Sequence, residues 1–163
     1  MNVHDCFKLH LAGSSRIVNA YLDDLSDSDL LVRAVPGINH IAWQIGHCLS
    51  AEHGLMESLR PGSMPKLPAD FENRHSSAAS RLDSASAFYS KATYVELIES
   101  QRQATIKVLD ATTAEAFDGP AVAPWNSFLP TVGAMFRCVG EHWLMHAGQW
   151  AVTRRKIGRP PLF

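Results

Sequence analysis

The stretch Glu141-His142-Trp143-Leu144-Met145-His146-Ala147-Gly148-Gln149 decides how this chain is interpreted. It lies within residues 131–157, where the spacing of apolar residues predicts one long helix ending at Gly158. On a helix, positions i and i+4 lie on one face with Cβ atoms roughly 5–6 Å apart, so His142 and His146 point the same way. Two imidazoles at this spacing can converge on one metal ion. A third from a facing helix would complete a three-nitrogen site with open positions, the ligand set typical of a catalytic metal.

The histidine pair alone gives weak support for a metal site. The chain contains 8 His in 163 residues, and at that frequency about 0.4 pairs with helical i, i+4 spacing are expected by chance. The remaining residues therefore have to strengthen or weaken the hypothesis.

The apolar periodicity predicts an all-α fold, a four-helix bundle with two long connections. Thr93 and Glu96 form a capping-box pattern at the start of one predicted helix. The second connection is apolar for a loop and is expected to pack over one end of the bundle. The predicted helices are residues 3–25, 36–59, 93–112 and 131–157, and the two connections are residues 61–90 and 114–130.

Composition limits the classes of protein that fit. A length of 163 residues predicts a single domain spanning 1–163. A net charge of −1 argues against nucleic-acid binding. No apolar run approaches the ~20 residues of a membrane span, and the N-terminus lacks a signal-peptide pattern, so we expect a cytoplasmic protein without a membrane partner. Cys6, Cys48 and Cys138 are too scattered for a disulfide framework and are predicted to be reduced, largely buried thiols.

The face of residues 36–59 that carries His47 also carries His40, Trp43 and Gln44. His40 and His47 are seven residues apart, about 10 Å along the axis, so at most one of them can join the histidine pair. His40 could line a pocket or be a hydrogen-bonded core residue. The face of His142 and His146 includes Gln149. Because ligating imidazoles usually donate their other N–H to an oxygen, Gln44 and Gln149 could orient the histidines or bind substrate. The substrate-pocket candidates are therefore His40, Trp43, Gln44 and Gln149.

Other polar residues are predicted to have no role at this site. Cys138 is too far from His146, about 12 Å along the helix, for one ion to join all three residues of that run, so Cys138 is expected to be a core thiol. Glu141 is expected to face solvent or to be the partner of a base rather than a ligand. The remaining predictions concern surface positions: His4, His10 and His75 are expected at the surface, His53 lies off the His47 face, and the side of the third helix with Glu99, Gln101, Arg102 and Lys107 is expected to be solvated.

Two motifs resemble those of the DinB/YfiT-like metalloenzyme family. The first is Asn-His-Ile-Ala-Trp-Gln-Ile-Gly-His at residues 39–47, and the second combines residues 140–149 with Arg154-Arg155 and Gly158-Arg159-Pro160. The resemblance implies a four-helix bundle, frequently a homodimer, with a divalent metal ion, often nickel or zinc, on three histidines. Carried over by position, these are His47, His142 and His146. The resemblance also leads us to expect that residues 61–90 shape a substrate pocket.

The same resemblance suggests three functions. Characterised relatives include transferases and isomerases that use low-molecular-weight thiols, so a thiol-dependent S-transferase acting on a small-molecule substrate is favoured. A metal-dependent hydrolase and a non-catalytic, stress-associated metal-binding bundle are alternatives. The sequence identifies no separate general base, and a protein whose histidines are only hydrogen-bonded core residues is the simplest competing interpretation.

Overall fold

Helices account for the regular structure of this chain. The computed structural model describes residues 1–160 and 162–163, and no strand occurs in that part, so the all-α prediction is confirmed. None of the helices described is long and apolar enough to cross a bilayer. The long helices are α1 (Val3–Asp23), α2 (Ile41–Leu59), α4 (Lys91–Asp110) and α5 (Val132–Lys156), and the short ones are α3 (Phe71–Arg74), η1 (Asp29–Leu31), η2 (Ala79–Arg81), η3 (Ala85–Ala87), η4 (Glu115–Asp118) and η5 (Trp125–Ser127).

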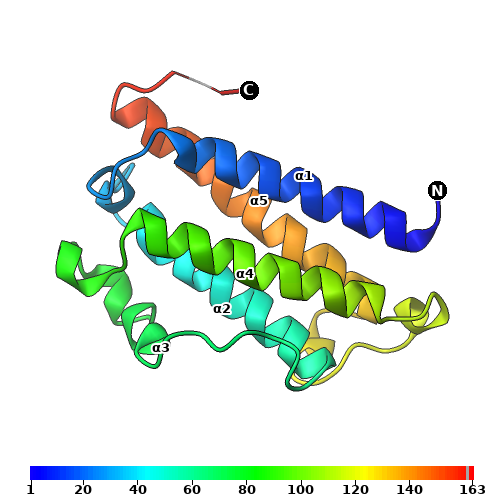
Figure 1. The fold of residues 1–163 in the computed structure, drawn as a ribbon. Helices are drawn as coiled ribbons and strands as arrows, with labels where there is room; N and C mark the ends of the chain where they lie inside the picture. The colour runs from blue at the N-terminus through cyan, green and yellow to red at the C-terminus, as the bar shows by residue number, and fades with distance from the viewer. Residues whose placement is uncertain (161) are drawn as a thin grey trace.

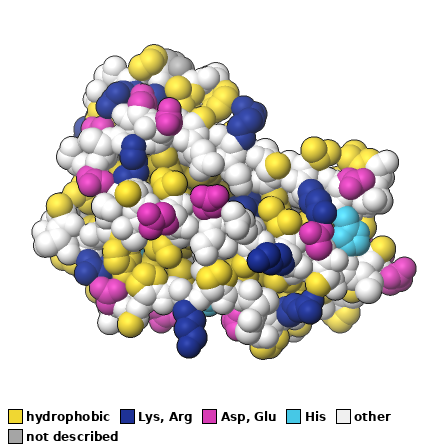
Figure 2. All heavy atoms as spheres, viewed as in Figure 1, with side chains coloured by type: hydrophobic (Ala, Val, Ile, Leu, Met, Phe, Trp, Pro, Cys, Tyr) yellow, Lys and Arg dark blue, Asp and Glu magenta, His cyan; other side chains and the backbone are white. Residues whose placement is uncertain are grey.

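The four long helices pack around one core. Helix α1 contacts α5 and α4, and α2 contacts α4 and α5. Figure 1 shows α2 and α4 running in the same direction, so the connection between them returns along the length of the molecule. The core includes the buried aromatic residues Phe136, Trp143 and Trp150 of α5. On the face shown in Figure 2, Lys and Arg side chains are interspersed with Asp and Glu, and no stripe of one sign crosses that face.

Two predicted helix starts are wrong. Helix α2 begins at Ile41 rather than near residue 36, because Gly37 adopts a positive φ of 84° and residues 35–38 form a turn. Helix α4 begins at Lys91, capped by Ser90, whose side chain accepts from the backbone N–H of Thr93. Thr93 is therefore inside the helix and is not its N-cap. The other predicted helix ends agree with the structure within two residues.

The prediction that Gln101 and Arg102 are solvated is wrong. Both are buried in α4, because polar partners from neighbouring helices face them. The guanidinium of Arg102 donates to the buried carboxylate of Glu52 on α2 at 3.1 Å. Thr105 and Trp143 donate to the same carboxylate, each at 2.7 Å. This Glu52 cluster, defined here as Glu52, Arg102, Thr105 and Trp143, joins α2, α4 and α5.

His75 is buried, contrary to its predicted surface position. Its ring lies against Gly46, where a Cβ would come within 1.9 Å of His75 Cδ2. The ring nitrogens contact the Phe71 carbonyl at 2.8 Å and the Tyr94 hydroxyl at 2.7 Å. Burial lowers the pKa of His75 to about 4. The polar connection after α2 thus packs against α2 at this point, because Gly46 has no side chain and leaves room for the ring of His75.

Three further surface and burial predictions are corrected. His4 and His10 are half-buried rather than exposed, because their ring nitrogens reach the backbone carbonyls of Thr112 and Arg137 across helix contacts. Cys6 is exposed, since it lies on the outward side of α1, whereas Cys48 is buried and Cys138 is half-buried.

Candidate metal centre

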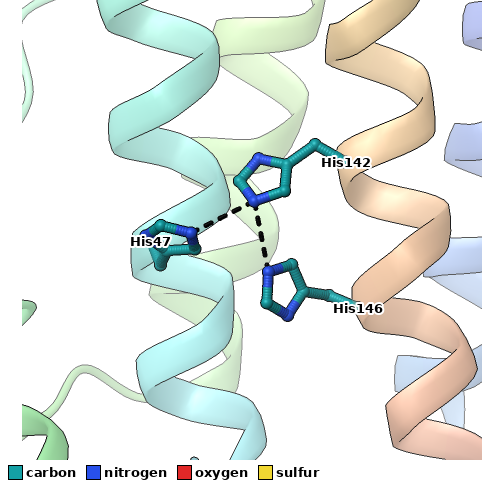
Figure 3. Close-up of side chains that lie close together, drawn as sticks. All are labelled: His47, His142 and His146. Atoms are coloured by element: carbon teal, nitrogen blue, oxygen red, sulfur yellow. Dashed lines mark hydrogen bonds between the residues drawn. The ribbon is translucent and has the colours of Figure 1, made fainter.

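Three histidines from two helices converge at the contact between α2 and α5 (Figure 3). His47 comes from α2, and His142 and His146 come from successive turns of α5. The Nε2 of His142 lies 3.1 Å from that of His47 and 3.2 Å from that of His146. One ring nitrogen from each residue lies within 4.8 Å of the other two. His146 is buried and the other two are half-buried, so the group lies below the surface with access from one side.

Trp43 orients His47. It lies one turn earlier on α2, and the two rings stack with centroids 5.2 Å apart and an interplanar angle of 8°. The Trp43 indole N–H donates to the carbonyl of Ser76 at 2.9 Å, which fixes the indole. The stacking therefore leaves the imidazole of His47 in one plane, directed at α5.

Gln44 orients His146. Its Oε1 lies 3.2 Å from His146 Nδ1 and accepts from the Trp150 indole at 2.8 Å, while its Nε2 donates to Gln149 Oε1 at 3.0 Å and to the Asn39 carbonyl. Because an amide oxygen can only accept, the hydrogen of His146 must sit on Nδ1. The Nε2 of His146 then presents a lone pair to the other two histidines.

The environment keeps these imidazoles neutral. Burial lowers the pKa of His47. Burial, followed by the neighbouring His47, lowers the pKa of His142 to about 4. Burial, His142 and His47 together lower that of His146 to about 4. Neutral imidazole is the form that binds metals, so the group is in its ligating form at neutral pH.

The three residues fit a divalent metal ion. Two nitrogens bound to a tetrahedral zinc ion, each at about 2.0–2.1 Å, are separated by about 3.3 Å. Two of the three nitrogen pairs lie close to this, at 3.1 and 3.2 Å, and the third lies within 4.8 Å. With the His146 hydrogen on Nδ1, both short contacts of His142 could be hydrogen bonds only if one hydrogen on His142 Nε2 were shared between the Nε2 atoms of His47 and His146. A cation would satisfy all three lone pairs at once. Imidazole ligands suit zinc, nickel, copper and iron.

A cavity of about 670 Å³ opens beside two of the histidines. Its rim includes Phe128 and Met145, which are 63% and 57% exposed. Most of its wall is apolar. The lining residues are His47, Ser50, Ala51, Leu55, Trp125, Phe128, Cys138, Glu141, His142 and Met145.

The four predicted substrate-pocket residues lie elsewhere around the histidines. His40 is buried at the N-cap of α2, where its Nδ1 accepts from the backbone N–H of Trp43 and its Nε2 contacts the Leu82 carbonyl at 3.0 Å. Trp43 stacks on His47, and Gln44 and Gln149 lie behind His146. None of the four is among the side chains that line the cavity.

Sequence reasoning missed the residues that form the cavity wall. Trp125 and Phe128 come from the connection between α4 and α5, and Met145 lies between the two histidines of α5. The apolar character of residues 114–130 was the available signal. Residues 61–90, expected to shape a substrate pocket, contribute no side chain to the lining of this cavity. They pack against α2 at Gly46 and at Trp43, and part of this segment lines a separate cavity.

Fold and site together define an all-α protein with a three-histidine group able to hold a metal ion. A sequence model of the DinB superfamily matches residues 10–150, a range that includes all three histidines. The chain belongs to the DinB superfamily, whose members typically bind a metal.

A crystal structure supports the same fold. The chain is similar to a structure described as a conserved protein from Enterococcus faecalis, with a TM-score of 0.72 and 16% sequence identity over 98% of this chain and 99% of that one. Identity at this level shows the fold alone. A comparison with curated proteins gives no match.

Proposed function

We propose that His47, His142 and His146 hold a divalent metal ion, nickel or zinc, inside a four-helix bundle with two long connections. We further propose that the protein is a metal-dependent enzyme of the thiol-dependent S-transferase class. The observation that carries the first proposal is the convergence of three neutral ring nitrogens within 4.8 Å. The cavity beside His47 and His142 favours an enzyme over a protein that only stores metal, because it gives a small molecule access to the site.

When bound, a divalent ion would lower the pKa of a thiol or water at its open position and so supply a nucleophile near neutral pH. The histidines contribute three neutral donors, which leave the ion its full positive charge. The apolar wall of the cavity would hold the second substrate and exclude water from the reacting atoms.

The proposed transfer is a substitution. A bond forms between the thiol sulfur and an electrophilic carbon, the leaving group departs with its bonding electrons, and the thiol proton passes to solvent. Glu141 is the only carboxylate among the lining residues. It is exposed and lies 3.6 Å from Arg137, so it does not serve as a buried general base. The thiol would instead lose its proton to solvent because the bound ion would lower its pKa.

Turnover with and without a thiol tests the proposed class. Tag-free protein would be assayed with an aryl halide and either glutathione or cysteine, alongside His142→Ala. We expect thiol-dependent product formation that the substitution and a chelator both abolish. Turnover by water alone would support the hydrolase instead. A metal-containing protein inactive in both assays would support the non-catalytic alternative.

A further inference from the structure

The walls of the cavity beside His47 and His142 are mostly apolar, although the proposed function requires a polar thiol. We infer that it binds the other substrate, and that this substrate is an uncharged small molecule with an aromatic or branched apolar body. Its role as the electrophile rests on the proposed function. The class of ligand rests on the cavity itself, whose volume of about 670 Å³ is typical of small-molecule sites.

Two aromatic side chains form the wall contributed by the α4–α5 connection. Trp125 lies in η5 and Phe128 follows it, with ring centroids 6.0 Å apart and an interplanar angle of 71°. Ala51 and Leu55 of α2 and Met145 of α5 also line the cavity. Aromatic rings in edge-to-face contact present both a face and an edge to a ligand, so a flat apolar molecule has complementary surfaces to pack against.

Gly54 determines how close the aromatic wall comes to α2. A Cβ at this position would lie 3.1 Å from Trp125 Cζ2, closer than ordinary van der Waals contact. Glycine in a helix interior is less favourable than alanine. Here its missing side chain provides the space that the indole occupies, so the position of the wall depends on this residue.

The rim exposes large apolar side chains. Phe128 and Met145 are more than half exposed although they border a hollow that leads to two histidines. Exposed apolar side chains grouped around a concavity are typical of binding sites. A ligand in the cavity would cover part of both.

The charges of the lining residues exclude anions. Among the residues that the structure describes, no Lys or Arg lines the cavity, and Glu141 is the one acidic residue that does. Away from the position proposed for the metal ion, a carboxylate placed among these walls would lose hydration without gaining a cationic partner. Charged low-molecular-weight thiols therefore match the position proposed for the metal ion rather than this apolar wall, whereas a neutral apolar molecule matches the wall.

Fluorescence titration with N-phenyl-1-naphthylamine, a neutral aromatic probe, tests the inference. We expect saturable binding to the wild-type protein and at least about tenfold weaker binding to Phe128→Ser, since the substitution removes an aromatic wall. Leu9→Ser is the matched control, because Leu9 on α1 has the same 63% exposure as Phe128 but lies outside the cavity. Its affinity should equal that of the wild type.

A second variant blocks the space directly. Ala51→Phe should also weaken probe binding by at least about tenfold, because the added ring fills the cavity. The anionic probe 1-anilinonaphthalene-8-sulfonate should bind more weakly than the neutral probe. Unchanged affinity in either cavity variant, or tighter binding of the anionic probe, would overturn the inference.

The same titration separates this inference from the proposed metal function. Chelator-treated protein should still bind the neutral probe in a Phe128-dependent manner, and Phe128→Ser should keep its full metal content. Protein that lacks metal but binds the probe would contradict the metal function alone. Protein that contains metal but shows no Phe128-dependent binding would contradict the cavity inference alone.

Discussion

At the residue scale, Gln44 controls the chemistry available to His146. Its carbonyl oxygen accepts from both His146 and Trp150, and its amide nitrogen is occupied by Gln149 and the Asn39 carbonyl. The amide therefore has one orientation, and the imidazole has one tautomer. Substituting a residue that orients a ligating imidazole in this way typically weakens metal binding by about 10–100-fold.

Replacing Gln44 with Leu should weaken metal binding by about 10–100-fold, because His146 loses the acceptor that keeps the hydrogen on Nδ1. Competition with a chromogenic chelator would measure the affinity. Gln103→Leu is the control, since Gln103 is exposed on α4 and its side chain donates to Glu99. Equal affinities in the two variants would show that the tautomer is not set by Gln44.

The lowered pKa values of His142 and His146, both to about 4, predict how the site responds to acid. The folded protein protonates these rings only near pH 4, whereas the unfolded chain does so near 6.5. Their contribution to stability is therefore complete above pH 6.5 and is lost as the pH falls through about 4. Metal should remain bound at about pH 5.5 and be released as the pH approaches 4.

Elemental analysis after dialysis across this pH range would measure retention, with circular dichroism to verify that the protein stays folded. Half-release near pH 6.5 would mean that the ligating histidines titrate like exposed ones.

At the element scale, α2 contacts α5 and the connection after α2 through two different faces. One face directs His47 at α5, and the adjacent residue Gly46 receives the ring of His75 from the connection after α2. The side chain missing at Gly46 is what lets that connection approach the helix. The three-histidine group and the connection after α2 are thus positioned by consecutive residues of one helix.

Gly46→Ala should destabilise the protein by roughly 1–3 kcal/mol, because the added methyl overlaps the His75 ring and something must move. Gly13→Ala on α1 is the matched control, since a Cβ there meets nothing within 4 Å. The control should be neutral or stabilising, as alanine favours helix more than glycine does. Urea denaturation of both variants would measure the free energies of unfolding, and equal values would contradict the proposed contact.

The sequence predicts elements better than it predicts their contacts. The helices follow from apolar periodicity and local capping, both of which depend on nearby residues. The burial of Arg102 could not be predicted in this way, because its partner Glu52 lies on another helix. His75 appeared to be a surface residue for the same reason. The aromatic residues at the cavity lie in a connection, where no periodicity indicates which way Trp125 and Phe128 point.

At the scale of the whole molecule, the Glu52 cluster joins the long helices close to the three-histidine group. Arg102 of α4 also contacts Ser14 of α1 at 3.1 Å, so all four long helices contribute to one polar network. Trp143, which donates to Glu52, is the neighbour of His142. A network that fixes α2 relative to α5 also fixes the distance between His47 and the histidine pair.

Arg102→Met should cost roughly 3–5 kcal/mol of stability, because it leaves the buried carboxylate of Glu52 without its cation. Lys8→Met removes a comparable ion pair, Lys8–Asp110 at 2.6 Å, from the surface and should cost at most about 1 kcal/mol. Thermal and urea unfolding of both variants would compare them. If the two substitutions cost the same, the buried network does not stabilise the arrangement of the helices.

The metal content of protein purified without an affinity tag tests the central claim most directly. Elemental analysis should find one divalent ion per chain in the wild type and less than about a tenth of that in His142→Ala. His40→Asn should retain the ion, because His40 caps α2 and lies outside the three-histidine group. A wild-type protein without metal, or a His142→Ala variant with undiminished metal content, would contradict the assignment of His47, His142 and His146 as ligands.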